Sequence, residues 1–362
     1  MNSIKLLFFV PHLYYGGIFV VFSRLLKGLS VLGYSVHVVV GDAEAQLLDQ
    51  LSQIQNINVT YLKAPRARNV IWELRRLLND GDYDVLIGVQ SHGVWAVVLS
   101  ALLSKYQGKI VSWEHGPPSL IDNQNMIDKV KIAFAKLLYL RVDKVFAVSK
   151  GVARDVAVFY NIKSEKVQEV PNPVYEILPQ VSRKNKKDGD VINFLFVGRL
   201  APVKGVNDIL RAFNMLACSN WRLTIVGDGP DLPILQNYVS TEGNIAEKVF
   251  FVGRQTNPGE WYERSDALIL ASYLEGLPTV LVEATIYGLP LISTDCESGP
   301  NEIISHGKNG LLVPVGDYKS LSLAIERLVA HYSTFSNEAS IVKRYKEDVA
   351  VKYFADSLNA IL

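Results

Sequence analysis

Residues 193–205 read NFLFVGRLAPVKG, and this stretch does more than any other to decide the fold. Its first five residues predict a short, largely apolar strand, which ends at Gly198 where the chain turns into a loop. A helical pattern follows over residues 206–216, and the same strand-then-glycine order recurs at Val226-Gly227 and Val252-Gly253. Largely apolar strands that alternate with helices indicate a parallel sheet covered on both faces.

The same alternation extends over the rest of the chain. Apolar strands are predicted at residues 6–10, 35–40, 84–89, 109–113 and 144–148, and then at 222–226, 249–252, 267–270 and 289–294. Residues 179–190 interrupt the series with a polar, charged segment that has no periodicity. A chain of 362 residues also exceeds what one hydrophobic core usually supports. We therefore predict an α/β protein with two Rossmann-like, doubly wound domains that face each other across a cleft.

Composition excludes several classes of function. The formal net charge is +1, so no overall charge favours nucleic acid as a partner. Residues 1–180 hold 19 Lys/Arg and 15 Asp/Glu, a balance of +4, whereas the remainder holds 18 and 21, a balance of −3. The two cysteines are too few for a disulfide framework and lack metal-ligand spacing. No signal peptide or membrane-spanning run is expected, and we predict a cytoplasmic location.

The motif EGLPTVLVE, residues 275–283, carries the strongest chemical signal. Its two glutamates lie eight positions apart, before and inside a helix predicted to begin near Pro278, where a proline fits the first turn. The free N–H groups of such a helix start can hold a phosphate. Glu275 can then bond sugar hydroxyls, and Glu283 can take a ribose diol. The alternative is a solvated helix face, which the apolar neighbours argue against.

Basic and glycine-rich loops supply the second signal. Arg199 and Lys204 follow a strand and lie between two glycines, an arrangement that suits a diphosphate. Gly16-Gly17 after the first strand allows backbone N–H groups to approach a phosphate closely. His115 ends a predicted strand, where a histidine can contact substrate or carry a proton. Taken singly, each of these features is also compatible with a structural role.

Together these residues resemble glycosyltransferase family 4, whose members are retaining enzymes with the GT-B fold. The likeness covers nearly the whole chain and is densest in the second half. The matching motifs are Gly16-Gly17, PNPV at 171–174, VGRL at 197–200 with Lys204-Gly205, VGDGP at 226–230, FVG at 251–253, Ser265-Asp266, the Glu275/Glu283 pair, SGPNEII at 298–304 and GKNGLLV at 307–313. One departure is Ile18-Phe19 after the glycine pair, where many members carry an acidic or small residue and then arginine.

The resemblance implies a role for each candidate residue. It assigns Arg199 and Lys204 to the donor diphosphate, Glu275 to the transferred sugar and Glu283 to the donor ribose. The candidate catalytic residues are Arg199, Lys204, Glu275 and His115, and the candidate donor-binding residues are Gly16, Gly17, Gly198, Arg254, Leu277, Thr279, Val280 and Glu283. The domains would be 1–180 for the acceptor, a linker at 181–190, and 191–345 for the donor, with helix 346–362 packed back on the first domain.

The implied reaction moves a hexose or N-acetylhexosamine from a nucleotide-diphosphate sugar, with UDP favoured, to a saccharide or lipid-linked acceptor in cell-surface polysaccharide or lipopolysaccharide synthesis. Front-face substitution, in which the leaving phosphate accepts the acceptor's proton, fits a site that holds cations and no suitable nucleophile. No cofactor is expected beyond the nucleotide sugar, and no metal is required. A nucleotide-sugar epimerase of the same fold and a non-catalytic binding module are the alternatives.

A basic, amphipathic pattern in the first half predicts one further partner. Lys129, Lys131, Lys136, Arg141 and Lys144 interleave with Ile132, Phe134, Leu137, Leu138 and Leu140. Such a helix can lie on anionic lipid, so we expect peripheral contact with the inner face of the cytoplasmic membrane. The alternative is an ordinary domain helix with a solvated face.

Overall fold

A computed structural model describes residues 3–64, 67–120, 126–176, 186–187, 190–336 and 339–362. The chain divides into two compact units, and each is described by itself. Unit 1 comprises residues 1–176 and 345–362, and unit 2 comprises residues 177–344. The predicted linker at 181–190 lies mostly outside the described residues.

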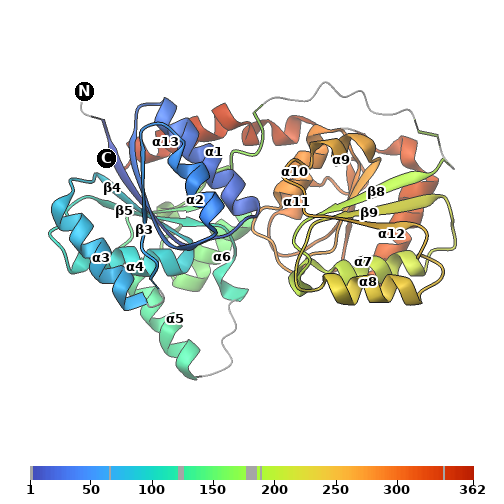
Figure 1. Cartoon of the computed structure of the whole chain (residues 1–362), viewed down its shortest axis with the longest axis horizontal. Helices are drawn as coiled ribbons and strands as arrows, with labels where there is room; N and C mark the ends of the chain where they lie inside the picture. Colours follow the sequence, from blue (N-terminus) through green and yellow to red (C-terminus); the bar gives the residue numbers. More distant parts are fainter. Residues whose placement is uncertain (1–2, 65–66, 121–125, 177–185, 188–189, 337–338) are drawn as a thin grey trace. The chain divides into compact units, whose positions relative to one another are not determined.

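Unit 1 is built on a parallel sheet of seven strands in the order β3-β2-β1-β4-β5-β6-β7 (Figure 1). All five residues of the central strand β4 are buried, as expected for a strand covered on both faces. The strands are β1 Lys5–Leu13, β2 Ser35–Ala43, β3 Ile57–Tyr61, β4 Val85–Val89, β5 Lys109–Glu114, β6 Lys144–Ala147 and β7 Val167–Glu169. The helices are α1 Gly17–Val31, α2 Ala45–Ser52, α3 Ala67–Asp80, α4 Gln90–Leu102, α5 Met126–Tyr139, α6 Lys150–Tyr160 and α13 Glu347–Asn359.

The last helix, α13, completes the core of unit 1 although it is the final element of the chain. It packs on α1 at Gly28, where a Cβ atom would come within 2.6 Å of the Val351 side chain, so glycine permits the close approach. Phe354 is buried against Trp113, with ring centroids 5.4 Å apart. The hydroxyl of the buried Tyr34 donates to Asn359 Oδ1 at 2.9 Å.

Unit 2 repeats the architecture with six parallel strands in the order β10-β9-β8-β11-β12-β13. Its inner strands β11 and β12 are buried throughout. The strands are β8 Ile192–Val197, β9 Trp221–Val226, β10 Val249–Gly253, β11 Ala267–Leu270, β12 Leu291–Thr294 and β13 Gly310–Val313. The helices are α7 Val206–Asn214, α8 Leu232–Thr241, α9 Gly259–Arg264, α10 Thr279–Ile286, α11 Pro300–Ile303 and α12 Tyr318–Ala330.

Two parallel, doubly wound sheets confirm the predicted fold class. The sequence analysis did not predict three strands, namely β3, β7 and β13. Each is short and contains at least one residue that is not fully buried. Each of the three lies at an end of its sheet and is therefore paired on one side only. Because such a strand needs no long apolar run, its sequence gives little signal. None of the helices formed by the described residues has the length and apolar character that crossing a bilayer requires.

Candidate functional site

The candidate site of unit 2 lies where its strand order reverses. The chain runs outward from β8 to β9 and β10, then crosses to the other side of β8 to form β11, β12 and β13. In a parallel sheet all strands point the same way, so their carboxyl ends share one edge, and ligands bind at the reversal point of that edge. The loops after β8 and β11 therefore meet there, and they carry Arg199, Lys204 and Glu275.

The loop after β8 is held in place by close backbone contacts. Lys204 ends a short 3₁₀ helix, Pro202–Lys204, and Gly205 follows in the left-handed conformation with φ of 62°. A Cβ atom on Gly205 would lie 2.0 Å from the Ala271 carbonyl oxygen, which directly follows β11. The Tyr273 N–H also donates to the Val203 carbonyl at 2.8 Å. Glycine at 205 thus lets the two loops touch, and this fixes the position of Lys204.

An ion pair joins the two loops at this point. Lys204 Nζ donates to Glu275 Oε1 at 2.6 Å, and the Ser272 hydroxyl donates to the same oxygen at 2.6 Å. The Ser298 hydroxyl, from the loop after β12, bonds the Glu275 carbonyl at 2.5 Å. The side chains of Lys204 and Glu275 are 26% and 10% exposed. The pair is therefore largely sheltered yet still open to a ligand, and each member orients the other.

Helix α10 begins three residues after Gly276 and presents its start to the same edge. Pro278 precedes its first residue, and no side chain of the described residues caps it. Just inside this start the Leu281 N–H donates to the Pro278 carbonyl at 3.0 Å. The N–H groups of Thr279 and Val280 belong to the first turn, where helices have unpaired donors that favour an anion. Leu277 is buried beside them.

The second glutamate, Glu283, lies one turn further along α10. The Tyr262 hydroxyl, from helix α9, donates to Glu283 Oε2 at 2.6 Å. Burial, followed by the adjacent Glu283 carboxylate, raises the pKa of Tyr262 well above its ordinary value, so the hydroxyl stays protonated and donates. Tyr262 itself is buried and stacks on Tyr287 with ring centroids 5.2 Å apart. Glu283, which is half-buried, is thus held in one orientation by Tyr262.

The remaining candidates of unit 2 lie on neighbouring loops of the same edge. Gly198 directly follows β8, and its N–H donates to the Val226 carbonyl at 3.0 Å. Arg199 is exposed next to it, and Arg254 is exposed directly after β10. The topology brings all these loops to one edge, and hydrogen bonds join Lys204 with Glu275 and Glu283 with Tyr262.

The candidates of unit 1 lie at the corresponding edge of its own sheet. Gly16 precedes α1 and Gly17 is its first residue, directly after the loop that follows β1. His115 follows β5 and contacts the Trp113 ring, with centroids 4.3 Å apart and the ring planes tilted by 57°. Burial lowers the pKa of His115 to about 3, so the ring is neutral at pH 7. Its Nε2 atom is buried and has no hydrogen-bond partner among the described residues.

Beneath His115 lies a buried polar network that the sequence analysis did not identify. Glu114, 2% exposed, accepts hydrogen bonds from Ser112 at 2.6 Å, from Ser91 at 3.2 Å and from Tyr139. Tyr160 donates to Ser91 at 3.0 Å. Burial raises the pKa of Glu114, and the hydrogen bonds from Ser112, Tyr139 and Ser91 lower it in part. The network ties α4, α5 and α6 to the end of β5, next to His115.

The sequence analysis also missed three partners in unit 2. Tyr262, Ser272 and Ser298 hold the two glutamates. Tyr262 and Ser272 are common residues in segments without a distinctive motif, and Ser298 opens the SGPNEII motif, which does not by itself indicate a contact with Glu275. Ser272 lies three residues before Glu275 on the same loop, which is a spacing that could have suggested it. Nothing in the sequence connects Tyr262 with Glu283, since the contact arises from the packing of α9 against α10.

Comparison with known families agrees with this geometry. The model described as "Glycosyltransferase Family 4" matches residues 15–175, and the one described as "Glycosyl transferases group 1" matches residues 179–347. The first match covers unit 1 apart from residues 1–14, which include β1, and the last helix, and the second covers almost all of unit 2. The chain therefore belongs to the family 4 glycosyltransferases, and it is an enzyme of that class.

Individual relatives of the chain are also glycosyltransferases. The chain is 29% identical over 318 residues to a lipopolysaccharide 1,6-galactosyltransferase of Salmonella typhimurium, covering 84% of this chain and 81% of that one. It is 25% identical to an N-acetylgalactosaminyltransferase of Campylobacter jejuni, which acts on a diphospho-undecaprenol substrate, over 99% of both chains. Among solved structures, the lipopolysaccharide outer core galactosyltransferase WaaB shares the fold with a TM-score of 0.79 and 22% identity, over 99% of this chain and 100% of that one.

Proposed function

We propose that the protein transfers a hexose or N-acetylhexosamine from a UDP-sugar, with retention of configuration, to a saccharide or lipid-linked glycan acceptor in the synthesis of a cell-surface polysaccharide. One observation carries the proposal: Lys204 and Glu275 form a sheltered ion pair at the reversal point of the unit 2 sheet. Relatives named as galactosyl- and N-acetylgalactosaminyltransferases support the sugar class. A protein of the same fold, Anabaena HepE, has been solved with UDP-glucose, which supports the nucleotide.

The donor diphosphate would be held by three kinds of positive charge. Lys204 Nζ uses one of its three N–H groups on Glu275, which leaves two for phosphate oxygens. Arg199 adds a planar guanidinium from the same loop, and the first turn of α10 adds backbone N–H groups and the positive end of the helix dipole. These groups would also stabilise the charge that develops on the leaving phosphate.

The two glutamates are assigned to different parts of the donor, namely the transferred sugar and the ribose. Glu275 lies beside Lys204, so we assign it to hydroxyls of the transferred sugar. Glu283 lies about one turn inside α10, eight residues after Glu275, and is oriented by Tyr262, so we assign it to the ribose diol. The backbone at residues 252–254, at the end of β10, is assigned to the base, with Arg254 at its margin.

In the proposed mechanism the acceptor hydroxyl attacks the anomeric carbon on the face that the diphosphate leaves. The departing phosphate oxygen takes the hydroxyl's proton, while Arg199 and Lys204 offset the charge. The roles of Gly16, Gly17 and His115 stay predictions. Because the pKa of His115 is lowered to about 3 by burial, the ring would act through a neutral hydrogen bond and not as an acid.

A ligand panel tests the donor assignment. UDP-, GDP- and ADP-sugars are compared by thermal shift, because a ligand present at about 100 times its Kd adds roughly 2.7 kcal/mol of stability. We expect UDP-hexoses or UDP-N-acetylhexosamines to raise the Tm most. A panel in which no UDP compound shifts the Tm, or in which GDP- or ADP-sugars alone do so, would overturn the assignment.

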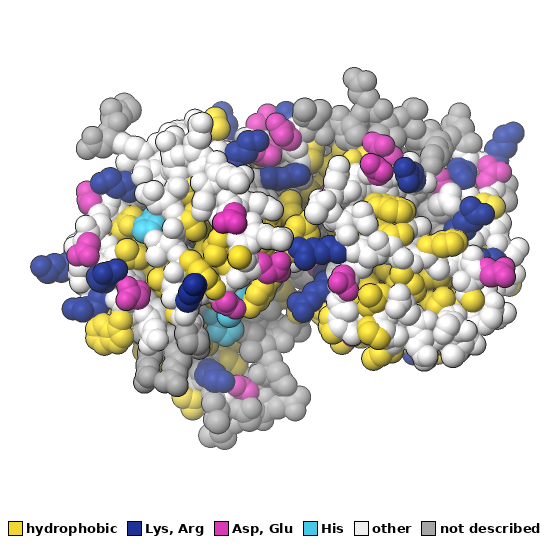
Figure 2. Space-filling model, in the orientation of Figure 1, with side chains coloured by type: hydrophobic (Ala, Val, Ile, Leu, Met, Phe, Trp, Pro, Cys, Tyr) yellow, Lys and Arg dark blue, Asp and Glu magenta, His cyan; other side chains and the backbone are white. Residues whose placement is uncertain are grey.

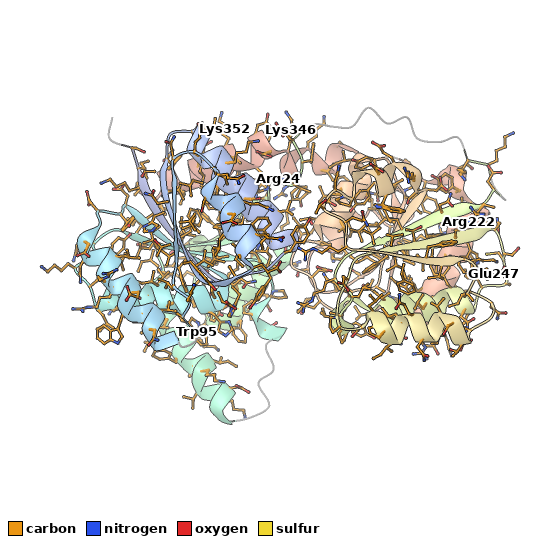
Figure 3. The ribbon with its side chains drawn as sticks, in the orientation of Figure 1. Arg24, Trp95, Arg222, Glu247, Lys346 and Lys352 are labelled. Carbon is orange, nitrogen blue, oxygen red and sulfur yellow. The ribbon has the colours of Figure 1, made fainter. Side chains whose placement is uncertain are left out.

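Two variants separate the roles of the glutamates. Glu283→Ala should abolish the shift with free UDP, because the ribose contact is lost. Glu275→Ala should keep the shift with free UDP but lose the extra shift with the UDP-sugar. Glu247→Ala is a matched control, since this exposed glutamate precedes β10 at the opposite edge of the sheet (Figure 3). Equal effects of all three variants would contradict the assignment of Glu275 to the sugar and Glu283 to the ribose.

A further inference from the structure

One residue of unit 1 has a backbone conformation that an L side chain disfavours. Gln90 has φ of 60°, in the left-handed region, and it is the first residue of α4, directly after β4. Four non-glycine residues of the described chain have a positive φ, namely Asn56, Lys63, Gln90 and Asn161. Asparagine tolerates this region well, and Asn161 ends α6, which is a common place for a left-handed residue. Gln90 differs because it belongs to a turn that leads from a strand directly into a helix.

Close packing keeps this turn from relaxing. A Cβ atom on Gly88 would lie 2.6 Å from Val94 Cα, and one on Gly93 would lie 3.1 Å from the Phe9 carbonyl oxygen. Helix α4 therefore starts in close contact with both β4 and β1. Glycine occupies these two close approaches, yet glutamine occupies the position whose φ glycine would adopt without strain. Strain of this kind is concentrated at functional sites, which makes the Gln90 side chain a candidate for one.

Gln90 lies at the point where the strand order of unit 1 reverses. The sheet extends from β1 to β2 and β3, and the chain then crosses to the other side of β1 to form β4, β5, β6 and β7. Ligands of parallel sheets bind at the carboxyl ends of the strands that flank such a reversal. Gln90 is half-buried there, and its side-chain amide makes no hydrogen bond to another described residue. An amide, which can both donate and accept, is thus available to a ligand at this edge.

Aromatic rings accompany Gln90 at the end of the neighbouring strand β1. Tyr14, directly after β1, is 52% exposed, and its hydroxyl donates to Asp42 Oδ2 at 2.7 Å. His12 stacks on Tyr14, with ring centroids 5.9 Å apart and planes only 6° from parallel. Burial lowers the pKa of His92, in the first turn of α4, and the nearby His12 and Lys131 lower it further. Figure 2 shows exposed histidine beside hydrophobic side chains on this unit.

Two ring nitrogens near this edge are buried and have no hydrogen-bond partner among the described residues. They are Trp95 Nε1, in the second turn of α4, and His115 Nε2, directly after β5. Trp95 is labelled in Figure 3, and its ring lies 5.3 Å from that of His92. Buried polar atoms are rarely left unpaired in proteins. The carboxyl ends of β4 and β5 therefore offer hydrogen-bonding groups that the chain itself does not use.

We propose that Gln90 positions the acceptor sugar, with its amide bonded to hydroxyls of the saccharide and the Tyr14 ring packed against the sugar's apolar face. Sugar hydroxyls donate and accept hydrogen bonds, as the amide does, and the C–H groups of a pyranose suit an aromatic surface. The left-handed backbone of Gln90 would fix where the amide stands, at the expense of stability. This inference rests on the proposed function and deepens it by naming a residue that holds the acceptor.

The first measurement tests the strain. In a helix alanine normally stabilises more than glycine, but a positive φ reverses the order. We expect Gln90→Gly to melt at least about 2 °C above Gln90→Ala. Asn161→Gly and Asn161→Ala are matched controls, since this exposed residue has φ of 52° but follows α6, at the opposite edge of the sheet. A Tm of Gln90→Gly below that of Gln90→Ala would overturn the proposal.

The second measurement is transfer from a UDP-sugar to the p-nitrophenyl glycosides of glucose, galactose and N-acetylgalactosamine. Gln90→Gly and Gln90→Ala should both lower kcat/KM for the glycoside about tenfold, because the hydrogen bonds of the amide are lost. The KM for the donor should stay within about twofold, and the Asn161 variants should keep both constants. A purely structural role of Gln90 cannot make the glycine variant more stable and less active. Unchanged acceptor kinetics, or equal changes for donor and acceptor, would overturn the proposal.

Binding of the same glycosides, followed by saturation-transfer NMR without any nucleotide sugar, separates this inference from the proposed function. We expect binding to the unaltered protein and to the Asn161 variants, and its loss in both Gln90 variants. No binding to the unaltered protein at millimolar glycoside would overturn the saccharide assignment. Glycoside binding that needs Gln90, in a protein whose Tm no UDP-sugar raises, would leave this site standing and the proposed function refuted. Normal transfer by the Gln90 variants would do the reverse.

Discussion

Replacing Lys204 with alanine tests the centre of the proposed mechanism. In the structure Lys204 Nζ is held at 2.6 Å from Glu275 Oε1, on a loop fixed by Gly205 against Ala271. The amine is therefore preorganised to face the leaving phosphate before the donor arrives. Loss of one preorganised donor to a developing oxyanion costs about 2.7–4 kcal/mol, which lowers kcat by roughly 10²–10³. We expect Lys204→Ala to fall in that range.

The same change has a separate effect on stability. Glu275, 10% exposed, would keep the Ser272 hydroxyl but lose its cation. Leaving a sheltered carboxylate without its partner costs about 1–3 kcal/mol, which corresponds to about 2–4 °C in Tm per kcal/mol for a unit of this size. Adding Glu275→Gln should recover much of that stability, because the amide carries no charge and still accepts from Ser272. It should not recover kcat.

The assay is release of nucleotide diphosphate at saturating donor and acceptor, with Tm measured on the same samples. Lys308→Ala is the matched control, since this exposed lysine precedes β13 at the opposite edge of the unit 2 sheet. A kcat for Lys204→Ala within about threefold of the unaltered enzyme would refute the role of Lys204, because so small a change is less than 1 kcal/mol of transition-state stabilisation. A kcat restored by the double variant would show that the loss came from strain at Glu275 and not from the missing charge.

Four further results are expected. Tyr262→Phe should raise KM for the donor about tenfold, and kcat less, because Glu283 loses the hydroxyl at 2.6 Å that orients it; an unchanged KM in steady-state kinetics would contradict this. Gly205→Ala should lower the Tm and kcat together, since φ of 62° and a Cβ 2.0 Å from a carbonyl oxygen force the loop to move; circular dichroism melting shows whether it does. Activity should persist after EDTA treatment because Arg199 and Lys204 supply the positive charge, and a loss that Mg²⁺ restores would overturn this. Burial raises the pKa of Glu114 above its ordinary value of 4.5, so this group stabilises the fold most below that pH and less as pH rises through its folded pKa. Glu114→Gln should remove this decline in the free energy of unfolding, measured by chemical denaturation between pH 4.5 and 8. Identical pH profiles for the variant and the unaltered protein would count against it.

The sequence by itself determined the class of the fold and the loops that carry the candidate site. Strand-then-glycine order at 197–198, 226–227 and 252–253 marks the carboxyl ends of three parallel strands, and the structure has strands ending within one residue of each glycine. The motif at 275–283 predicted a helix start near Pro278, and α10 begins at Thr279. These features are readable because each depends on neighbours along the chain: apolar periodicity, glycine geometry and the fit of proline to a first turn.

Tertiary structure alone decided how those residues are held. The sequence placed Lys204 and Glu275 in separate motifs, and only the adjacency of β8 and β11 brings Nζ within 2.6 Å of Oε1. The contact of Tyr262 with Glu283 and the burial of Glu114 by three helices likewise join residues distant along the chain. The sequence could also predict that α5 is amphipathic, but not that its outward face would carry exposed apolar side chains such as Phe134 and Leu137. Which side of a helix meets the core is set by packing against other elements, and no local pattern encodes it.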